Sequence, residues 1–552
     1  MMARSLQLLA GLVILTCGTG LPILGPIFGP HDEAASTALR DVVGGVGVGG
    51  GGGPPGDGVT GPGNGSDNVK ELFMEQRLDH FDRQNSKTFS QRYFMNKRFW
   101  TGADSGAPVF LCVGGEGPPL AANVLIESVH CNDMMELAPQ HNALLLAVEH
   151  RYYGKSNPGD DWATKRLRWL SSQQALADLS SFHGYLSDRE GLTGAEKWVT
   201  WGAGSYPGML AGWARLKYPH LFHAAVSSSS PMKAQVDFPQ YAEVMRDSLA
   251  SEEDGVGGSE ECASAVEAGH AQIGGMLQTQ EGRLDLVATF DLCETHSLED
   301  ESARVMFAGD GVVALPIQGN DPACDGTLCN IEAVCGIMTD GFRGSEVQRL
   351  ATVRKIQRAS SLSTAEKLGE EIPCEVFPPI SSGDRSVAAG LRMSMSSQRG
   401  LSRSSAMDPS NPDRAWLYQT CSEFGFYQTC EVDTRCPFTQ GLHTLEMDLI
   451  MCEEAFGIKP DQVRDQVRLT NLFYGGDHPS GSRVIFPNGA IDPWHALGVL
   501  ETPMPGLPAI FIEGASHHFW THPSKPTDSP EIVEAREVIW DQVTSWLEED
   551  DD

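Results

Sequence analysis

Short apolar runs that each end in glycine or polar residues constrain the fold of this chain more than any other feature. They lie at residues 108–113, 143–148, 198–201, 483–489 and 508–514. Continuous apolar runs of this length predict strands that are buried on both faces, as in a parallel sheet. Helical patterns at residues 171–179 and 209–217 lie between or after these runs. The alternation predicts an α/β fold.

The composition changes along the chain and divides it into five predicted parts. They are a signal peptide at 1–20, a Gly/Pro-rich linker at 21–68, the first part of the α/β domain at 69–235, a helical cap insertion at 236–405, and the second part of the α/β domain at 406–549. Arg4 before the apolar stretch Leu6–Cys17 is typical of a secretory signal. An uncleaved membrane anchor is the alternative, but the stretch is short for a span.

Net charge and cysteine content indicate which partners and which cellular compartment suit this protein. The formal net charge is −33, which argues against nucleic acid or an anionic membrane surface as a partner. Cys17 lies in the predicted signal, which leaves 13 − 1 = 12 cysteines for up to six disulfides in an oxidising compartment. Zinc is the alternative, but Cys324, Cys329 and Cys335 lack the CxxC spacing of common zinc sites. One glycosylation sequon begins at Asn64.

A serine in a glycine-rich segment is the first candidate for catalytic chemistry. Ser205 follows the predicted strand at 198–201 and precedes the predicted helix at 209–217. A sharp, strained strand-to-helix turn would expose the hydroxyl, and small neighbours such as Gly204 would allow strand and helix to approach. The backbone amide of Tyr206, at the start of the helix, could then stabilise an oxyanion. The alternative is a passive serine in a turn.

Partners for this serine follow in the chain order Ser, Asp, His that is typical of α/β-hydrolases. Asp492 and His517 each follow a late predicted strand. His517 would act as the base, and Asp492 would orient the imidazole and stabilise its cation. A turn-forming Asp before a proline and a histidine in a surface loop are the alternatives, and the adjacent His518 leaves the identity of the base open.

Other kinds of site find little support in the sequence. The chain has no HExxH motif, and no GK[ST] follows the glycines at 114–117. We therefore predict neither a metal nor a cofactor.

Several motifs in order resemble the S28 serine peptidases over roughly residues 72–547. They are Glu149–Gly154, Gln174–Asp178, Gly204–Tyr206, Asn488–Gly489 and Asp492–Trp494, with Trp416–Cys430 most similar to the thymus-specific branch of that family. The resemblance implies an α/β-hydrolase fold with an inserted, mainly helical, disulfide-containing cap. It implies Ser205, Asp492 and His517 as the catalytic triad, and Gly115, from the loop after the first predicted strand, as the second oxyanion amide.

The resemblance also implies an activity. We expect a serine-type exopeptidase that acts on peptides, with a preference near proline, in a secreted or lysosome-like compartment and without stable membrane association. A carboxylic ester hydrolase and a catalytically weak binding protein on the same fold are the alternatives. The sequence leaves open whether cleavage starts at the amino or the carboxyl terminus, and whether the chain is a monomer or a homodimer.

Overall fold

The computed structural model describes residues 68–293, 296–361, 374–375 and 406–549. The predicted signal peptide, the glycosylation sequon and all but the last residue of the predicted linker lie outside this range. Large parts of the predicted cap, 362–373 and 376–405, also lie outside it. Among the described residues, no helix combines the length and the apolar character that a bilayer span requires.

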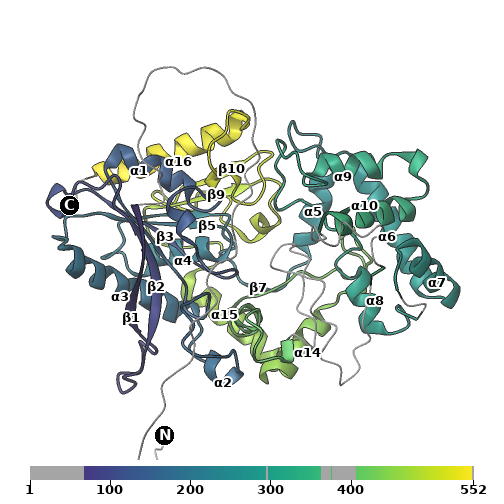
Figure 1. Cartoon of the computed structure of the whole chain (residues 1–552), viewed down its shortest axis with the longest axis horizontal. Helices are drawn as coiled ribbons and strands as arrows, with labels where there is room; N and C mark the ends of the chain where they lie inside the picture. Colours follow the sequence, from purple (N-terminus) through teal and green to yellow (C-terminus); the bar gives the residue numbers. More distant parts are fainter. Residues whose placement is uncertain (1–67, 294–295, 362–373, 376–405, 550–552) are drawn as a thin grey trace, which may run out of the picture. The chain divides into compact units, whose positions relative to one another are not determined.

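One eight-stranded sheet organises the fold (Figure 1). Its strands in spatial order are β1 (Val69–Arg77), β2 (Thr88–Asn96), β4 (Leu144–Val148), β3 (Val109–Val113), β5 (Trp198–Ala203), β6 (Ala224–Ser228), β9 (Val484–Gly489) and β10 (Ala509–Ile512). The pairs β1–β2 and β2–β4 are antiparallel, and all the others are parallel. This order, with a helix after β5, is an α/β-hydrolase sheet, which confirms the predicted fold class.

The buried strands alternate their side chains between two helical layers. The flanking helices are α1 (Asn132–His141), α3 (Ser172–Glu190), α4 (Tyr206–Lys217) and α16 (Pro530–Glu548). Leu111 of β3 belongs to the same buried cluster as Trp213 of α4. Its neighbour Phe110 belongs to the cluster that contains Ile539 of α16. Helices therefore cover both faces, which is why these strands are apolar without interruption (Figure 1).

Five sheet strands were predicted, and the structure confirms each within a few residues of the predicted limits. The sequence did not reveal β1, β2 and β6. The antiparallel pair β1–β2 lies at the edge of the sheet, and β1 alternates exposed charged residues with buried ones, so it lacks a continuous apolar run. Strand β6 is built from Ala, Val and Ser, which give a weak hydrophobic signal although all five residues are buried.

Residues 240–361 form helices that pack around a hydrophobic cluster of their own. These helices are α5 (Gln240–Ala250), α6 (Glu260–Leu277), α7 (Gln280–Thr289), α8 (Glu301–Ala308), α9 (Ile331–Met338) and α10 (Glu346–Ser361). The cluster also includes Ile491, which immediately precedes Asp492. The helical insertion thus contacts the segment that carries the predicted catalytic acid.

The chain does not return directly to the sheet after residue 405. Strand β8 (Gly425–Tyr427) pairs in parallel with β7 (Gln235–Asp237) in a separate two-stranded sheet. The helices near it are α13 (Arg414–Gln419), α14 (Leu445–Phe456) and α15 (Pro460–Tyr474), and a short helix, α2 (Thr164–Leu167), precedes α3. The main sheet resumes only at β9, so much of the predicted second α/β part consists of helices and loops.

The twelve cysteines of the described residues form six disulfides. The pairs are Cys112–Cys131, Cys262–Cys335, Cys293–Cys374, Cys324–Cys329, Cys421–Cys452 and Cys430–Cys436. Such complete pairing is typical of proteins that fold in the secretory pathway.

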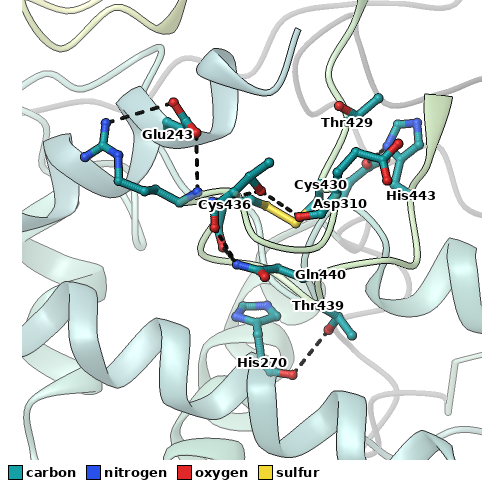
Figure 2. The surroundings of a disulfide bond; sticks show 12 residues. Glu243, His270, Asp310, Thr429, Cys430, Cys436, Thr439, Gln440 and His443 are labelled. Carbon is teal, nitrogen blue, oxygen red and sulfur yellow. Dashed lines mark hydrogen bonds and ion pairs between the residues drawn. A yellow bond between two sulfur atoms is a disulfide. The ribbon is translucent and has the colours of Figure 1, made fainter. Parts of the chain in front are cut away.

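The loop at residues 428–444, which we call the strap, leads from β8 into α14 and contacts the helical insertion. Figure 2 shows its disulfide and its residues Thr439 and His443 beside His270 and Asp310. It contains the disulfide Cys430–Cys436, and the hydroxyl of Thr439 donates to the His270 carbonyl of α6. At its end, the His443 ring contacts Asp310 at 2.5 Å and Asp448 at 3.0 Å. Burial alone would lower the pKa of His443, but these two carboxylates raise it to about 11.

Two of the motifs that carry the family resemblance meet in a buried ion pair. The Arg151 guanidinium donates two hydrogen bonds of 2.6 Å to the Asp178 carboxylate, and both side chains are almost fully buried. Arg151 also donates to the backbone carbonyls of Arg77, Leu78 and Trp169. The pair therefore fixes the loop after β4 against α3 and the end of β1.

Replacement of Asp178 should destabilise the fold strongly. Asp178→Asn leaves the Arg151 charge buried without its counter-ion, so we expect the free energy of unfolding to fall by about 3–5 kcal/mol. Denaturant titration measures this change. Asp465→Asn is the matched control, because Asp465 pairs with Arg468 at 3.8 Å on the exposed face of α15 and should cost about 1 kcal/mol or less. Equal effects of both variants would contradict the structural role of the buried pair.

The strap should stabilise the fold in a pH-dependent manner. The pKa of His443 is raised above its unfolded value of about 6.5, so its stabilisation is complete below that pH and is lost as the pH rises toward about 11. We expect the stability difference between wild type and His443→Gln to shrink from pH 6.5 to pH 9. His478→Gln, at an exposed histidine, is the control and should show little difference at either pH. A constant difference for His443→Gln would argue against a charged imidazole at this position.

Candidate active site

Ser205 lies between the end of β5 and the first residue of α4. Its backbone has φ −84° and ψ −65°, within the right-handed helical region. The expectation of a strained turn is therefore wrong at the serine itself. Helix α4 begins at Tyr206, three residues before the predicted start, because Pro207 is compatible with the first turn of a helix.

Close approach of the backbone explains the small residues around Ser205. A Cβ atom on Gly202 would lie 2.1 Å from the Pro207 carbonyl oxygen, and one on Gly204 would lie 2.4 Å from His517 Nε2. Both distances are too short for a side chain. Glycine is required here because the helix packs tightly on the strand and the histidine ring packs on the turn.

A continuous hydrogen-bonded chain connects the three residues that the sequence singled out. Ser205 Oγ lies 3.0 Å from His517 Nε2, and His517 Nδ1 lies 2.8 Å from Asp492 Oδ2. Ser205 and His517 are each 6% exposed, and Asp492 is fully buried. The other carboxylate oxygen of Asp492 accepts from the Trp494 amide at 3.0 Å. An imidazole held in this way can take a proton from the serine and keep the resulting charge next to a carboxylate.

The adjacent histidine lies in a different environment. His518 has φ 43°, and its Nδ1 contacts the Thr521 hydroxyl at 3.0 Å. Its amide donates to Ser229 Oγ beyond β6. Burial lowers the pKa of His518 well below its usual value, and the neighbouring His517 adds to this effect. The geometry therefore distinguishes two residues that the sequence alone left equivalent: His517 faces the serine, and His518 anchors the loop.

The helical insertion contacts the histidine loop directly. The His517 amide donates to the Gln318 carbonyl at 3.1 Å, and Ser516 Oγ donates to the Asn320 carbonyl at 2.8 Å. The Gln318 side chain accepts from the Tyr241 hydroxyl of α5 at 2.8 Å. Sequence reasoning missed Gln318, Asn320 and Tyr241, because they lie in a polar segment without a recognisable motif.

The loop after β3 lies beside the start of α4, close to Ser205. Its residue Gly115 packs so closely on α4 that a Cβ atom would lie 2.4 Å from Pro207 Cγ. The backbone of Gly115 thus lies beside the start of the helix, near the amide of Tyr206. The Tyr206 side chain points away into the core, where its hydroxyl contacts His150 Nε2 at 3.1 Å.

The side chains that commonly bind metal ions are spread over the structure. Within the described ranges, His, Cys, Asp and Glu side chains do not gather in groups of three or more that could hold a metal ion.

Comparison with known proteins identifies the family. The model of the serine carboxypeptidase S28 family matches residues 76–539. The mouse thymus-specific serine protease is 36% identical over 483 residues, which are 87% of this chain and 88% of that protein. Human lysosomal Pro-X carboxypeptidase is 25% identical over 490 residues, 87% and 88% of the two chains. Among solved structures, proline iminopeptidase of Mycobacterium smegmatis aligns with a TM-score of 0.33 and 11% identity, over 86% of this chain and 99% of that one.

The family match spans the sheet from β2 to β10, the helical insertion and the segments that carry Ser205, Asp492 and His517. A hydroxyl, an imidazole and a carboxylate in hydrogen-bonding distance are the groups that a serine peptidase requires. The chain therefore belongs to the serine carboxypeptidase S28 family and is a serine peptidase.

Proposed function

We propose that this enzyme is an exopeptidase that cleaves peptides near proline through Ser205, His517 and Asp492. The hydrogen-bonded chain from Ser205 Oγ through His517 to Asp492 is the observation that carries the proposal. The name of one relative, lysosomal Pro-X carboxypeptidase, supports a preference for proline. The disulfides and the same relative support a secreted or lysosome-like location.

The chemistry follows from the roles of the three side chains. Ser205 Oγ attacks the carbonyl carbon of the scissile bond while His517 Nε2 takes the hydroxyl proton. The Asp492 carboxylate stabilises the imidazolium that forms. Collapse of the tetrahedral intermediate breaks the carbon–nitrogen bond, and His517 returns the proton to the leaving amine. Water then hydrolyses the ester on Ser205 by the same proton transfers in reverse.

Backbone amides would hold the oxyanion in this scheme. The Tyr206 amide is free of helical hydrogen bonds because it belongs to the first turn of α4. The Gly115 amide is the second proposed donor, since its loop packs against Pro207. Preorganised donors of this kind typically contribute about 10²–10³-fold to the rate.

The helical insertion supports the exopeptidase mode. Its Gln318 carbonyl accepts from the amide of the proposed catalytic base, so the insertion lies directly at the site. A cap in this position would exclude the middle of a long chain and admit only chain ends.

A serine-directed probe tests the triad. We expect a fluorophosphonate to label wild type and not Ser205→Ala, because the Ser205 oxygen attacks the phosphorus and displaces fluoride while His517 takes the hydroxyl proton. Ser187→Ala, at a serine on α3, should retain labelling. Asp492→Asn should reduce kcat by about 10⁴-fold, because the imidazole would lose its orienting carboxylate. Labelling of Ser205→Ala at the wild-type level would refute the assignment.

The close contact at Gly204 offers an independent test. A methyl group at this position would displace the His517 ring, so Gly204→Ala should slow fluorophosphonate labelling by about 100-fold. Gly184→Ala is the control, because a Cβ atom on this exposed α3 residue meets nothing within 4 Å. Stopped-time labelling followed by mass spectrometry gives both rates. Equal rates for the two variants would show that the ring does not depend on Gly204.

A peptide digest tests substrate class. Wild-type enzyme should remove residues from the ends of peptides that contain proline near a terminus, and mass spectrometry identifies the products. Acyl esters of similar size serve as the comparison. Faster turnover of esters, or cleavage in the middle of long peptides, would replace the exopeptidase proposal.

A further inference from the structure

Glu116 places a carboxyl group without a counter-ion beside the proposed oxyanion site. It lies in the loop after β3, between Gly115 and Gly117, and the residue is partly exposed. Its oxygen Oε2 is shielded from solvent and has no hydrogen-bond partner. Among the described residues, no Lys, Arg or His acts on the charge of this carboxyl.

The loop that carries Glu116 is held firmly. The Gly114 amide donates to the Val148 carbonyl at 2.9 Å, and a Cβ atom on Gly114 would lie 2.5 Å from that oxygen. On its other side, Gly115 packs on Pro207 at the start of α4. Because both glycines make such close contacts, the loop cannot easily withdraw the carboxyl from the nucleophile.

The electrostatic environment agrees with an uncompensated charge. Burial raises the pKa of Glu116 to about 7, and only its own amide and the Tyr206 amide act to lower it. The Tyr206 amide therefore lies close enough to favour the charged form of this carboxyl. The same amide is the donor that we propose for the oxyanion on the substrate.

A negative carboxylate at this amide conflicts with catalysis. It would compete for the Tyr206 donor and repel the oxyanion that forms on the carbonyl next to Ser205. A cation from the substrate removes the conflict, since it neutralises the carboxylate and satisfies the unpartnered oxygen. The cation must lie within a residue or two of the scissile bond, because Glu116 follows Gly115, which packs on Pro207 two residues after Ser205. A free α-amino group meets this condition in every short amino-terminal segment, whatever its side chains.

We propose that Glu116 binds the α-ammonium group of the peptide substrate, so that this enzyme cleaves from the amino terminus. The proposal rests on the proposed exopeptidase function and adds its direction. Glu116 is then a specificity-determining residue: it selects substrates by a charge that is present at one end of a peptide and absent at the other.

Matched peptide pairs test this assignment. Each pair is a fluorogenic peptide amide of one, two or three residues, with either a free or an acetylated amino terminus. For wild type we expect kcat/KM to be about 100-fold higher for the free amine in at least one length, because acetylation leaves the buried carboxylate unpaired. In Glu116→Gln this ratio should fall to within about fivefold, since the neutral amide loses its preference for a cation.

Two controls make the result specific. Glu127→Gln changes an exposed glutamate shortly after the loop and should retain the wild-type ratio. The second control is an acetylated peptide with a lysine next to the scissile bond, which tests whether any nearby cation can replace the α-ammonium group. If this peptide is cleaved as fast as the peptide with a free amine, Glu116 does not recognise the amino terminus. Equal rates for free and acetylated peptides in wild type, or an unchanged ratio in Glu116→Gln, would overturn the proposal as well.

The test of Glu116 can fail without failure of the proposed peptidase function, and the two failures can be told apart. Fluorophosphonate labelling of wild-type Ser205 establishes a competent nucleophile independently of any peptide, and the labelled fraction normalises all rates. If labelling fails, the proposed function itself falls. If labelling succeeds and acetylated peptides are cleaved as fast as free ones, only the role of Glu116 falls.

Discussion

The contact between Ser205 Oγ and His517 Nε2 is the interaction on which the rest of the structure depends. It joins residues 312 positions apart, so its 3.0 Å distance requires that β5, α4 and the loop after β10 all be placed correctly. Glycine at 202 and 204 allows this approach, because any larger residue would collide with the helix or with the imidazole. Parallel strands achieve the convergence, since their carboxyl ends meet at one edge of the sheet.

Buried charged groups stabilise the loops around this contact, and one of them lies beside the proposed oxyanion site. Arg151 and Asp178 form a neutral pair whose remaining donors are satisfied by backbone carbonyls, and they hold the loop after β4 in place. His443 holds two carboxylates at the end of the strap. Glu116 differs from both because it has a buried oxygen and pairs with no cation in the described part of the chain. The contrast is the reason why we assign the first two to architecture and Glu116 to the substrate.

The helical insertion is part of the site as well as a cover for it. Gln318 and Asn320 accept hydrogen bonds from the loop that carries His517, and Ile491 beside Asp492 packs into the insertion's own core. The strap contacts α6 through Thr439 and α14 through His443. Its disulfide lies between these contacts and Glu243 of α5 in Figure 2. Movement of the insertion would therefore displace both His517 and the segment that carries Asp492.

The sequence by itself determined the α/β class, the even number of cysteines available for disulfides and the candidates Ser205, Asp492 and His517, because each depends on local pattern and chain order. It missed β1, β2 and β6, whose hydrophobic signals are weak without knowledge of their neighbours. Only the tertiary structure placed the ring of His517, and not that of His518, beside Ser205. Only it revealed Gln318 and the Glu116 oxygen that lacks a hydrogen-bond partner. The physical reason is that hydrogen-bond partners and burial are set by segments hundreds of residues apart, whereas periodicity and motif spacing are properties of the local chain.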